Sequence, residues 1–201
     1  NTQLADIKAT AAVGGRHPLP SPAAFSEVLR SFGITPLSRV VGYDDKSGAN
    51  AAARFWWMLR AAGLENVQVL DGGIQAAIAA GFPASDRNET SRPEDFAFDY
   101  WQLPTADLSK IDAVYQDENF LIVDVREKPR YDGETEPFDK IAGHIPNAVN
   151  IPFGENLGEN GRFLPAAKLR EKYEAALGDF AAEKTIVHCG SGVTACHTLL
   201  A

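Results

Sequence analysis

A cysteine followed by a glycine-rich turn stands near the end of the chain, where residues 189–194 read C-G-S-G-V-T. A β-branched run at 185–187 precedes Cys189, and a helix can begin at Val193, so the order is strand, tight loop, helix. In such a loop, successive backbone N–H groups and the positive end of the following helix converge on the thiol and lower its pKa. We therefore hypothesise nucleophilic cysteine chemistry at Cys189. The alternative is a buried structural cysteine in an ordinary strand-to-helix turn.

The loop also resembles a known family. C-G-S-G-V-T-A-C-H at 189–197 is similar to the active-site loop of the rhodanese superfamily. Within it the loop resembles the 3-mercaptopyruvate sulfurtransferase type, whereas the thiosulfate type carries basic residues after the cysteine. A cysteine-dependent phosphatase would need an arginine six positions after the nucleophile to bind phosphate, and Ala195 stands there. The resemblance therefore implies sulfur transfer and disfavours phosphatase chemistry.

The resemblance assigns roles within the loop. It implies that Cys189 carries a sulfane sulfur as a persulfide and that Ser191 hydrogen-bonds the donor sulfur or relays a proton. Backbone N–H groups would stabilise the charge on thiolate and persulfide. The predicted catalytic residues are therefore Cys189 and Ser191, and the predicted substrate-binding residues in the loop are Gly190, Gly192, Val193 and Thr194.

Composition bounds the class of protein. The 201 residues are 45% hydrophobic and 23% charged, which is typical of a globular protein with one large or two small domains. A formal charge of −8 argues against nucleic acid or an anionic membrane as a partner. No apolar run approaches the length of a transmembrane helix, and no signal peptide is visible. Cys189 and Cys196 form a poor disulfide framework and are too few for zinc, so we predict the cytoplasm, with no metal and no organic cofactor.

Strand and helix signals alternate along the chain. This rhythm predicts an α/β fold with mostly parallel strands covered by helices. In the first part we expect a helix from Ser21-Pro22 to Gly33, a strand at 39–43, a helix at 50–62, a strand at 67–70 and an alanine-rich helix to Ala80. Further on we expect a helix at 107–115, a strand at 120–123, a helix from Leu164-Pro165 and the strand that leads into Cys189.

An internal repeat divides these elements. The interval from Pro20 to Asp44 and from Pro165 to Cys189 is 24 residues in both, across a helix and a strand. Asp44 thus stands where the second copy has its thiol, and a carboxylate cannot carry sulfur. We predict two rhodanese-like domains. Residues 1–84 form a non-catalytic domain without its amino-terminal half, 85–105 a linker whose aromatics lie against the protein surface, and 106–201 a catalytic domain without its carboxyl-terminal end.

The second copy carries further motifs of the family. Arg130 in K-P-R-Y matches the substrate-binding arginine, and the alternative is a surface arginine on a polar turn. Asp124 and Arg126 are expected to form a structural ion pair behind the loop, and His144 in G-H-I-P is expected to be structural. Mercaptopyruvate enzymes usually place a second arginine after the E-P found at 136–137, but this chain reads Phe138-Asp139-Lys140. Clamping of a carboxylate is therefore expected to be weaker.

The residues and the resemblance together predict an enzyme. We expect Cys189 to pass sulfur from 3-mercaptopyruvate to a thiol or cyanide, with small molecules and thioredoxin as partners. Two alternatives stay open. One is thiosulfate as the donor, and the other is a catalytically silent rhodanese-like module that binds proteins.

Overall fold

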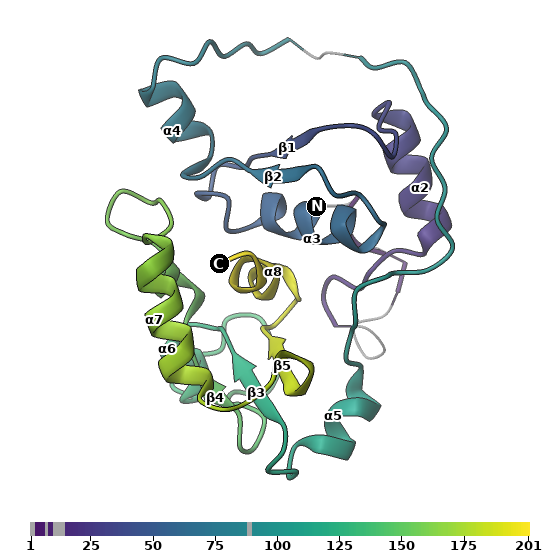
Figure 1. Cartoon of the computed structure of the whole chain (residues 1–201). Helices are drawn as coiled ribbons and strands as arrows, with labels where there is room; N and C mark the ends of the chain where they lie inside the picture. Colours follow the sequence, from purple (N-terminus) through teal and green to yellow (C-terminus); the bar gives the residue numbers. More distant parts are fainter. Residues whose placement is uncertain (1–2, 7, 10–14, 88–89) are drawn as a thin grey trace. The chain divides into compact units, whose positions relative to one another are not determined.

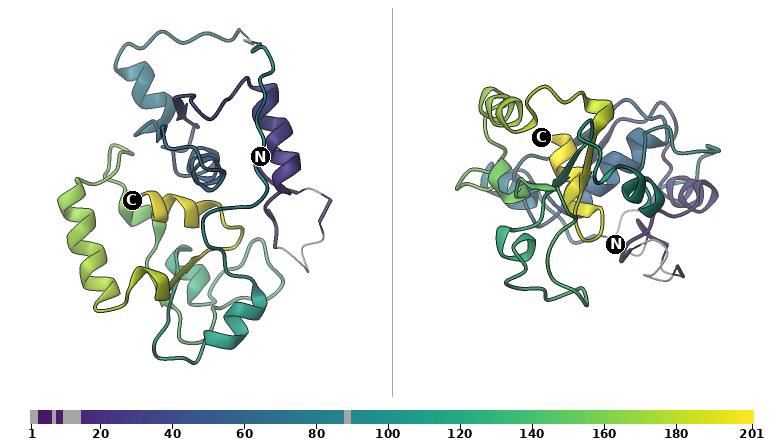
Figure 2. Two further views of the ribbon diagram at one scale, coloured as in Figure 1. Left: turned by 45° about the vertical axis from the view of Figure 1, so that its right-hand side comes forward. Right: turned by 90° about the horizontal axis from the view of Figure 1, so that it is seen from below.

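A computed structural model describes residues 3–6, 8–9, 15–87 and 90–201. The chain divides into two compact units, Asn1–Pro104 and Thr105–Ala201, and residues 85–104 fall within the first. The functional boundaries predicted at residues 84 and 105 stay a prediction. Figures 1 and 2 show that each unit contains strands and helices, which confirms the α/β class.

The first unit contains a two-stranded parallel sheet in which Val40 pairs with Val67. Its first helix begins where the sequence predicts, because the Ser21 side chain accepts a hydrogen bond from the N–H of Ala24 at 3.2 Å. The helix ends before Gly33, whose φ of 66° lies in the left-handed region that favours glycine. The elements are α2 (Pro22–Ser31), β1 (Val40–Gly42), α3 (Ala51–Ala61), β2 (Val67–Val69) and α4 (Gly73–Ala79).

An extended segment follows α4 and runs beside α2 in Figure 1 and in the left view of Figure 2. Its backbone is tied to the helix by a hydrogen bond from the N–H of Glu94 to the carbonyl of Arg30 at 3.2 Å. The ring of Trp101 packs against that of the fully buried Phe25, with 5.5 Å between centroids. Phe96 is also buried, whereas Tyr100 is 70% exposed. The prediction that aromatic side chains hold this segment to the protein surface is therefore confirmed, except for Tyr100.

The second unit is built on a three-stranded sheet in the order β4-β3-β5, with every pair parallel. Its core comprises Leu121, Val123, Val125, Ile151 and Ala195, and Cys189 packs against this cluster. The parallel arrangement predicted from the sequence is confirmed in both units. The elements are α5 (Leu108–Val114), β3 (Leu121–Asp124), α6 (Lys128–Tyr131), β4 (Val149–Asn150), η1 (Phe153–Asn156), α7 (Ala166–Leu177), η2 (Ala182–Lys184), β5 (Thr185–His188) and α8 (Val193–Leu200).

Within the described residues, every helix is too short or too polar to cross a membrane.

Candidate active site

The cysteine loop lies between the end of β5 at His188 and the start of α8 at Val193. Gly192 makes the turn into the helix with φ 75°, a conformation that costs most other residues free energy. This turn aims backbone donors at the sulfur. Cys189 Sγ accepts hydrogen bonds from the N–H of Gly192 at 3.1 Å and of Ser191 at 3.4 Å. The predicted order of strand, loop and helix is thus confirmed.

The surroundings of Cys189 lower the pKa of its thiol. Burial by itself raises this pKa, because it disfavours the thiolate. A hydrogen bond from the Thr194 hydroxyl and further bonds from the N–H groups of Ser191, Ala195 and Thr194 outweigh burial, so the net shift is downward. The sequence identified Thr194 as a backbone donor only, and its hydroxyl adds a contact that the loop pattern does not encode.

The structure places the predicted loop residues as follows. Ser191, Gly192 and Thr194 donate hydrogen bonds to the sulfur, Val193 is the buried first residue of α8, and Gly190 follows Cys189 in the turn. Cys196 lies one turn into the helix, where it is buried and its thiol donates to the carbonyl of Gly192 at 3.1 Å. Neither cysteine takes part in a disulfide in the part of the chain that the structure describes. The catalytic and binding roles of these residues stay predictions.

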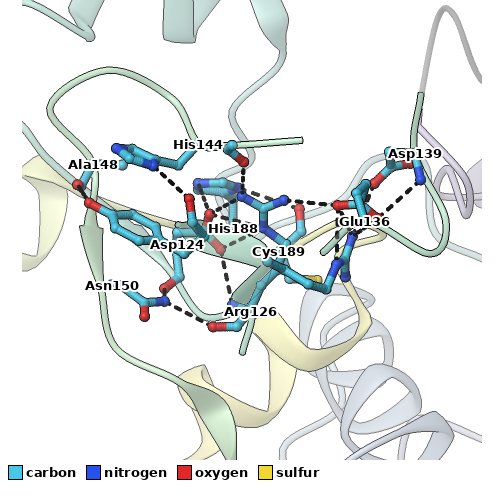
Figure 3. Close-up of polar contacts among 12 residues, drawn as sticks. Asp124, Arg126, Glu136, Asp139, His144, Ala148, Asn150, His188 and Cys189 are labelled. Atoms are coloured by element: carbon cyan, nitrogen blue, oxygen red, sulfur yellow. Dashed lines mark hydrogen bonds and ion pairs between the residues drawn. The ribbon is translucent and has the colours of Figure 1, made fainter. Parts of the chain in front are cut away.

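A buried ion pair lies at the end of β3, as Figure 3 shows. The fully buried carboxylate of Asp124 accepts from Nε of Arg126 through both oxygens, and Nη2 of Arg126 lies 2.6 Å from Oδ2. The same guanidinium donates to the carbonyl of Gly143 at 2.6 Å. Burial raises the pKa of Asp124, but hydrogen bonds from Arg126 outweigh it and the net shift is downward. The predicted ion pair is therefore confirmed.

Two histidines lie near this buried ion pair. Nε2 of His188 lies 3.8 Å from Oδ2 of Asp124, and burial lowers the pKa of His188 despite this carboxylate. His144 stacks on Tyr131, with 3.8 Å between ring centroids, and its Nδ1 lies 2.7 Å from the carbonyl of the same tyrosine. This packing supports the structural role predicted for His144. No three His, Cys, Asp or Glu side chains of the described residues form a group that could hold a metal ion.

Arg130, the predicted anion ligand, is already engaged within the chain. It lies in α6, with its side chain 14% exposed, and its Nε and Nη2 donate to the Glu136 carboxylate at 3.1 and 2.8 Å. Nη2 also lies 3.2 Å from Oδ2 of Asp139, and the guanidinium lies 5.1 Å from the centre of the Phe138 ring. The role of Arg130 as the anion ligand stays a prediction. The sequence contained the acidic partners six and nine positions further on, but no pattern indicated that they turn back onto Arg130.

Glu136 organises the turn that carries these partners. Its side chain is 5% exposed, and Oε1 accepts the N–H groups of Phe138 at 3.0 Å and Asp139 at 3.1 Å. Burial raises the pKa of Glu136, but Arg130 and these two N–H groups lower it to about 2. Nη1 of Arg126 approaches the same carboxylate at 3.5 Å, as Figure 3 shows for Arg126 and Glu136. Glu136 therefore links Arg126 to Arg130.

The first unit has its own loop between a strand and a helix, and Asp44 lies in it. Its Oδ1 accepts the N–H groups of Lys46 at 2.9 Å and Gly48 at 2.8 Å. Its Oδ2 accepts those of Asn50 and Ala52, both at 3.0 Å. The carboxylate therefore occupies a ring of backbone donors and presents no thiol. This arrangement agrees with the prediction that the first copy is non-catalytic, which stays a prediction.

Comparisons with known proteins agree with this geometry. The rhodanese-like domain family matches residues 10–80 and 107–201. The chain is 42% identical over 190 residues to a probable 3-mercaptopyruvate sulfurtransferase of Pseudomonas aeruginosa, covering 94% of this chain and 66% of that protein. It is 37% identical to a thiosulfate sulfurtransferase of Bos taurus, covering 91% of this chain and 63% of that protein. The chain thus spans slightly less than two thirds of these curated relatives.

A solved structure gives the same result. SseA of Escherichia coli, described as a 3-mercaptopyruvate sulfotransferase with the rhodanese fold, superposes with a TM-score of 0.81 at 27% identity. The match covers 98% of this chain and 72% of that chain. The resemblance and the fold predicted from the sequence are therefore confirmed.

Proposed function

Because the chain belongs to the rhodanese-like family, we propose that it is part of a sulfurtransferase in which Cys189 carries sulfur as a persulfide. The observation that carries this proposal is the environment of Cys189. Its sulfur accepts hydrogen bonds from the N–H groups of Ser191 and Gly192, and the pKa of its thiol is lowered. A thiolate is the form that attacks sulfur, and the same donors suit the negative outer sulfur of a persulfide.

The transfer has two steps. The Cys189 thiolate attacks the sulfur of 3-mercaptopyruvate, an S–S bond forms, and the C–S bond breaks with its electron pair moving to carbon. The proton from the donor thiol ends on that carbon, which yields pyruvate, and we assign the relay of this proton to Ser191. In the second step a thiolate or cyanide attacks the outer sulfur, and the Cys189 thiolate leaves. Neither step needs an external oxidant or reductant.

The neutral loop favours mercaptopyruvate as the donor. Gly190 and Ser191 follow the cysteine where basic side chains would suit the two charges of thiosulfate. Thiosulfate remains the second candidate, because Phe138 stands where a second carboxylate-binding arginine would lie and a relative is named a thiosulfate sulfurtransferase. Replacing Gly190-Ser191 with Arg-Lys should shift the preference toward thiosulfate by about 10-fold or more. A wild-type protein that already loads faster from thiosulfate would overturn the choice of donor.

The acceptor and the compartment follow from the same chemistry. Cys189 and Cys196 are both thiols, which suits a reducing compartment, and we place the protein in the cytoplasm. Small thiols and thioredoxin are the acceptors that such a compartment offers to a persulfide. Asp44 has no sulfur to exchange, so the second of the two tandem domains does the chemistry.

Intact-mass measurement after incubation with mercaptopyruvate tests the proposal. We expect one added sulfur, about 32 Da, that maps to the Cys189 peptide and is removed by reductant. Cys189→Ser should abolish the addition, while Cys196→Ser, which changes the other thiol of the same unit, should retain it. A label on Cys196, or no loading from either donor, would refute the proposal, and the second outcome would favour a silent binding module.

A further inference from the structure

The guanidinium of Arg130 faces two carboxylates that differ in exposure. Glu136 is 5% exposed and holds its own turn, so it belongs to the buried framework. The side chain of Asp139 is 37% exposed, and its Oδ2 lies 3.2 Å from Nη2 of Arg130. Of the two carboxylates, Asp139 is therefore the more accessible to a dissolved donor.

The turn holds Asp139 in this place. Its N–H donates to Oε1 of Glu136 at 3.1 Å, and Glu136 is itself fixed to Arg130 at 2.8 Å. Phe138, between the two acids, lies against the guanidinium at 5.1 Å and adds no second positive charge. The proposed donor site is thus centred on Arg130, which pairs with Glu136 and Asp139. Glu136 also contacts Arg126 at 3.5 Å.

We infer that Asp139 is a specificity-determining residue that competes with the sulfur donor for Arg130 and discriminates against donors with two negative charges. This inference rests on the proposed function. Coulomb repulsion between Asp139 and a donor scales with the donor's charge, so it acts about twice as strongly in free energy on thiosulfate as on mercaptopyruvate. Partly exposed charge pairs have modest energies, so removing the Asp139 charge should raise the affinity for a monoanionic donor by about 3-fold. For a dianion the free-energy change doubles, so the factor is squared to about 10-fold.

The test compares Asp139→Asn with wild type and with Asp132→Asn. Asp132 is a matched control, because it directly follows α6, the helix that carries Arg130, and has the same charge as Asp139. Its carboxylate pairs instead with Lys128 at 2.8 Å. The rate of Cys189 persulfide formation is measured against the concentration of each donor, at low and at high salt. We expect Asp139→Asn to lower the half-saturating concentration about 3-fold for mercaptopyruvate and about 10-fold for thiosulfate, with the maximal rate nearly unchanged.

Salt and a charge-preserving variant separate this role from a structural one. The gain in donor affinity of Asp139→Asn should shrink at high salt, because exposed charges are screened there. Asp139→Glu keeps the charge and should behave like wild type. Equal effects on both donors, an equal gain in Asp132→Asn, or a fall in the maximal rate alone would overturn the inference.

A second readout does not depend on sulfur transfer. Pyruvate, which has the donor's carboxylate without its sulfur, should protect Cys189 from alkylation at about 3-fold lower concentration in Asp139→Asn than in wild type. If no donor loads Cys189 while this protection still tightens, the proposed function fails, and only the competition of Asp139 with a bound carboxylate is supported. If the donors load Cys189 but Asp139→Asn matches wild type in both readouts, the inference alone fails.

Discussion

Replacing Thr194 with valine removes the hydroxyl that hydrogen-bonds Cys189 while keeping the shape of the side chain. That hydroxyl is the strongest of the contacts that lower the pKa of the thiol. A hydrogen bond to a charged group contributes about 1.5–3 kcal/mol, and we take the lower end because sulfur is a weak acceptor. One pKa unit corresponds to about 1.4 kcal/mol, so the pKa of Cys189 should rise by about one unit.

Alkylation by a neutral reagent measures this shift directly. The pH at which the rate reaches half its maximum gives the pKa, and peptide mass analysis keeps Cys189 separate from Cys196. Near neutral pH the thiolate fraction should fall up to about 10-fold, but the more basic thiolate is more nucleophilic, so the rate should fall about 3-fold.

Thr198→Val is the matched control for this experiment. Thr198 is buried one turn further along α8, and its hydroxyl contacts Nδ2 of Asn156 at 3.5 Å. Its replacement should leave the pKa of Cys189 unchanged. An unchanged pKa in Thr194→Val would show that the backbone donors alone set the acidity of the thiol. An equal rise of the Cys189 pKa in Thr198→Val would show that the rise does not come from the lost Thr194 hydroxyl.

Three further predictions concern Arg130, Glu136 and Trp101. Arg130→Lys keeps the positive charge but loses the paired N–H donors of the guanidinium. Steady-state kinetics should therefore show a donor KM about 10-fold higher, with a smaller change in kcat. The pKa of Glu136 is lowered to about 2, so its contribution to folding is complete above its ordinary pKa and is lost as pH falls toward 2. The urea midpoints of wild type and Glu136→Gln should therefore differ at pH 7 and converge in acid, whereas the exposed Glu159→Gln should match wild type throughout. Trp101→Ala should lower the free energy of unfolding by about 2–3 kcal/mol in urea titration, against almost no change for Tyr100→Ala.

The elements around Cys189 were predictable because local signals agree there. The β-branched run, two glycines and the helix start at Val193 all specify one strand-loop-helix unit, which the structure contains. Ser21-Pro22 likewise specified the start of α2 through its side-chain cap. Such signals act within a few residues, so the sequence reveals them.

The surroundings of Arg130 were not predictable in the same way. Its carboxylate partners lie on an irregular turn with no hydrophobic periodicity, and only the folded path of the chain brings Glu136 back to α6. The contact of His188 with Asp124 also depends on the pairing of β3 with β5. Register between strands distant in sequence is set by the whole sheet, so neither contact has a local signature.

The carboxylate of Asp44 has a consequence for how the chain tolerates mutation. Its two oxygens accept four backbone N–H groups, from Lys46, Gly48, Asn50 and Ala52. An apolar replacement would leave several of these donors unsatisfied, at a cost of about 1–3 kcal/mol each where water cannot reach them. We therefore expect the stability of the fold to constrain position 44. In a library of all substitutions selected only for solubility and protease resistance, aspartate should dominate this position, with asparagine next.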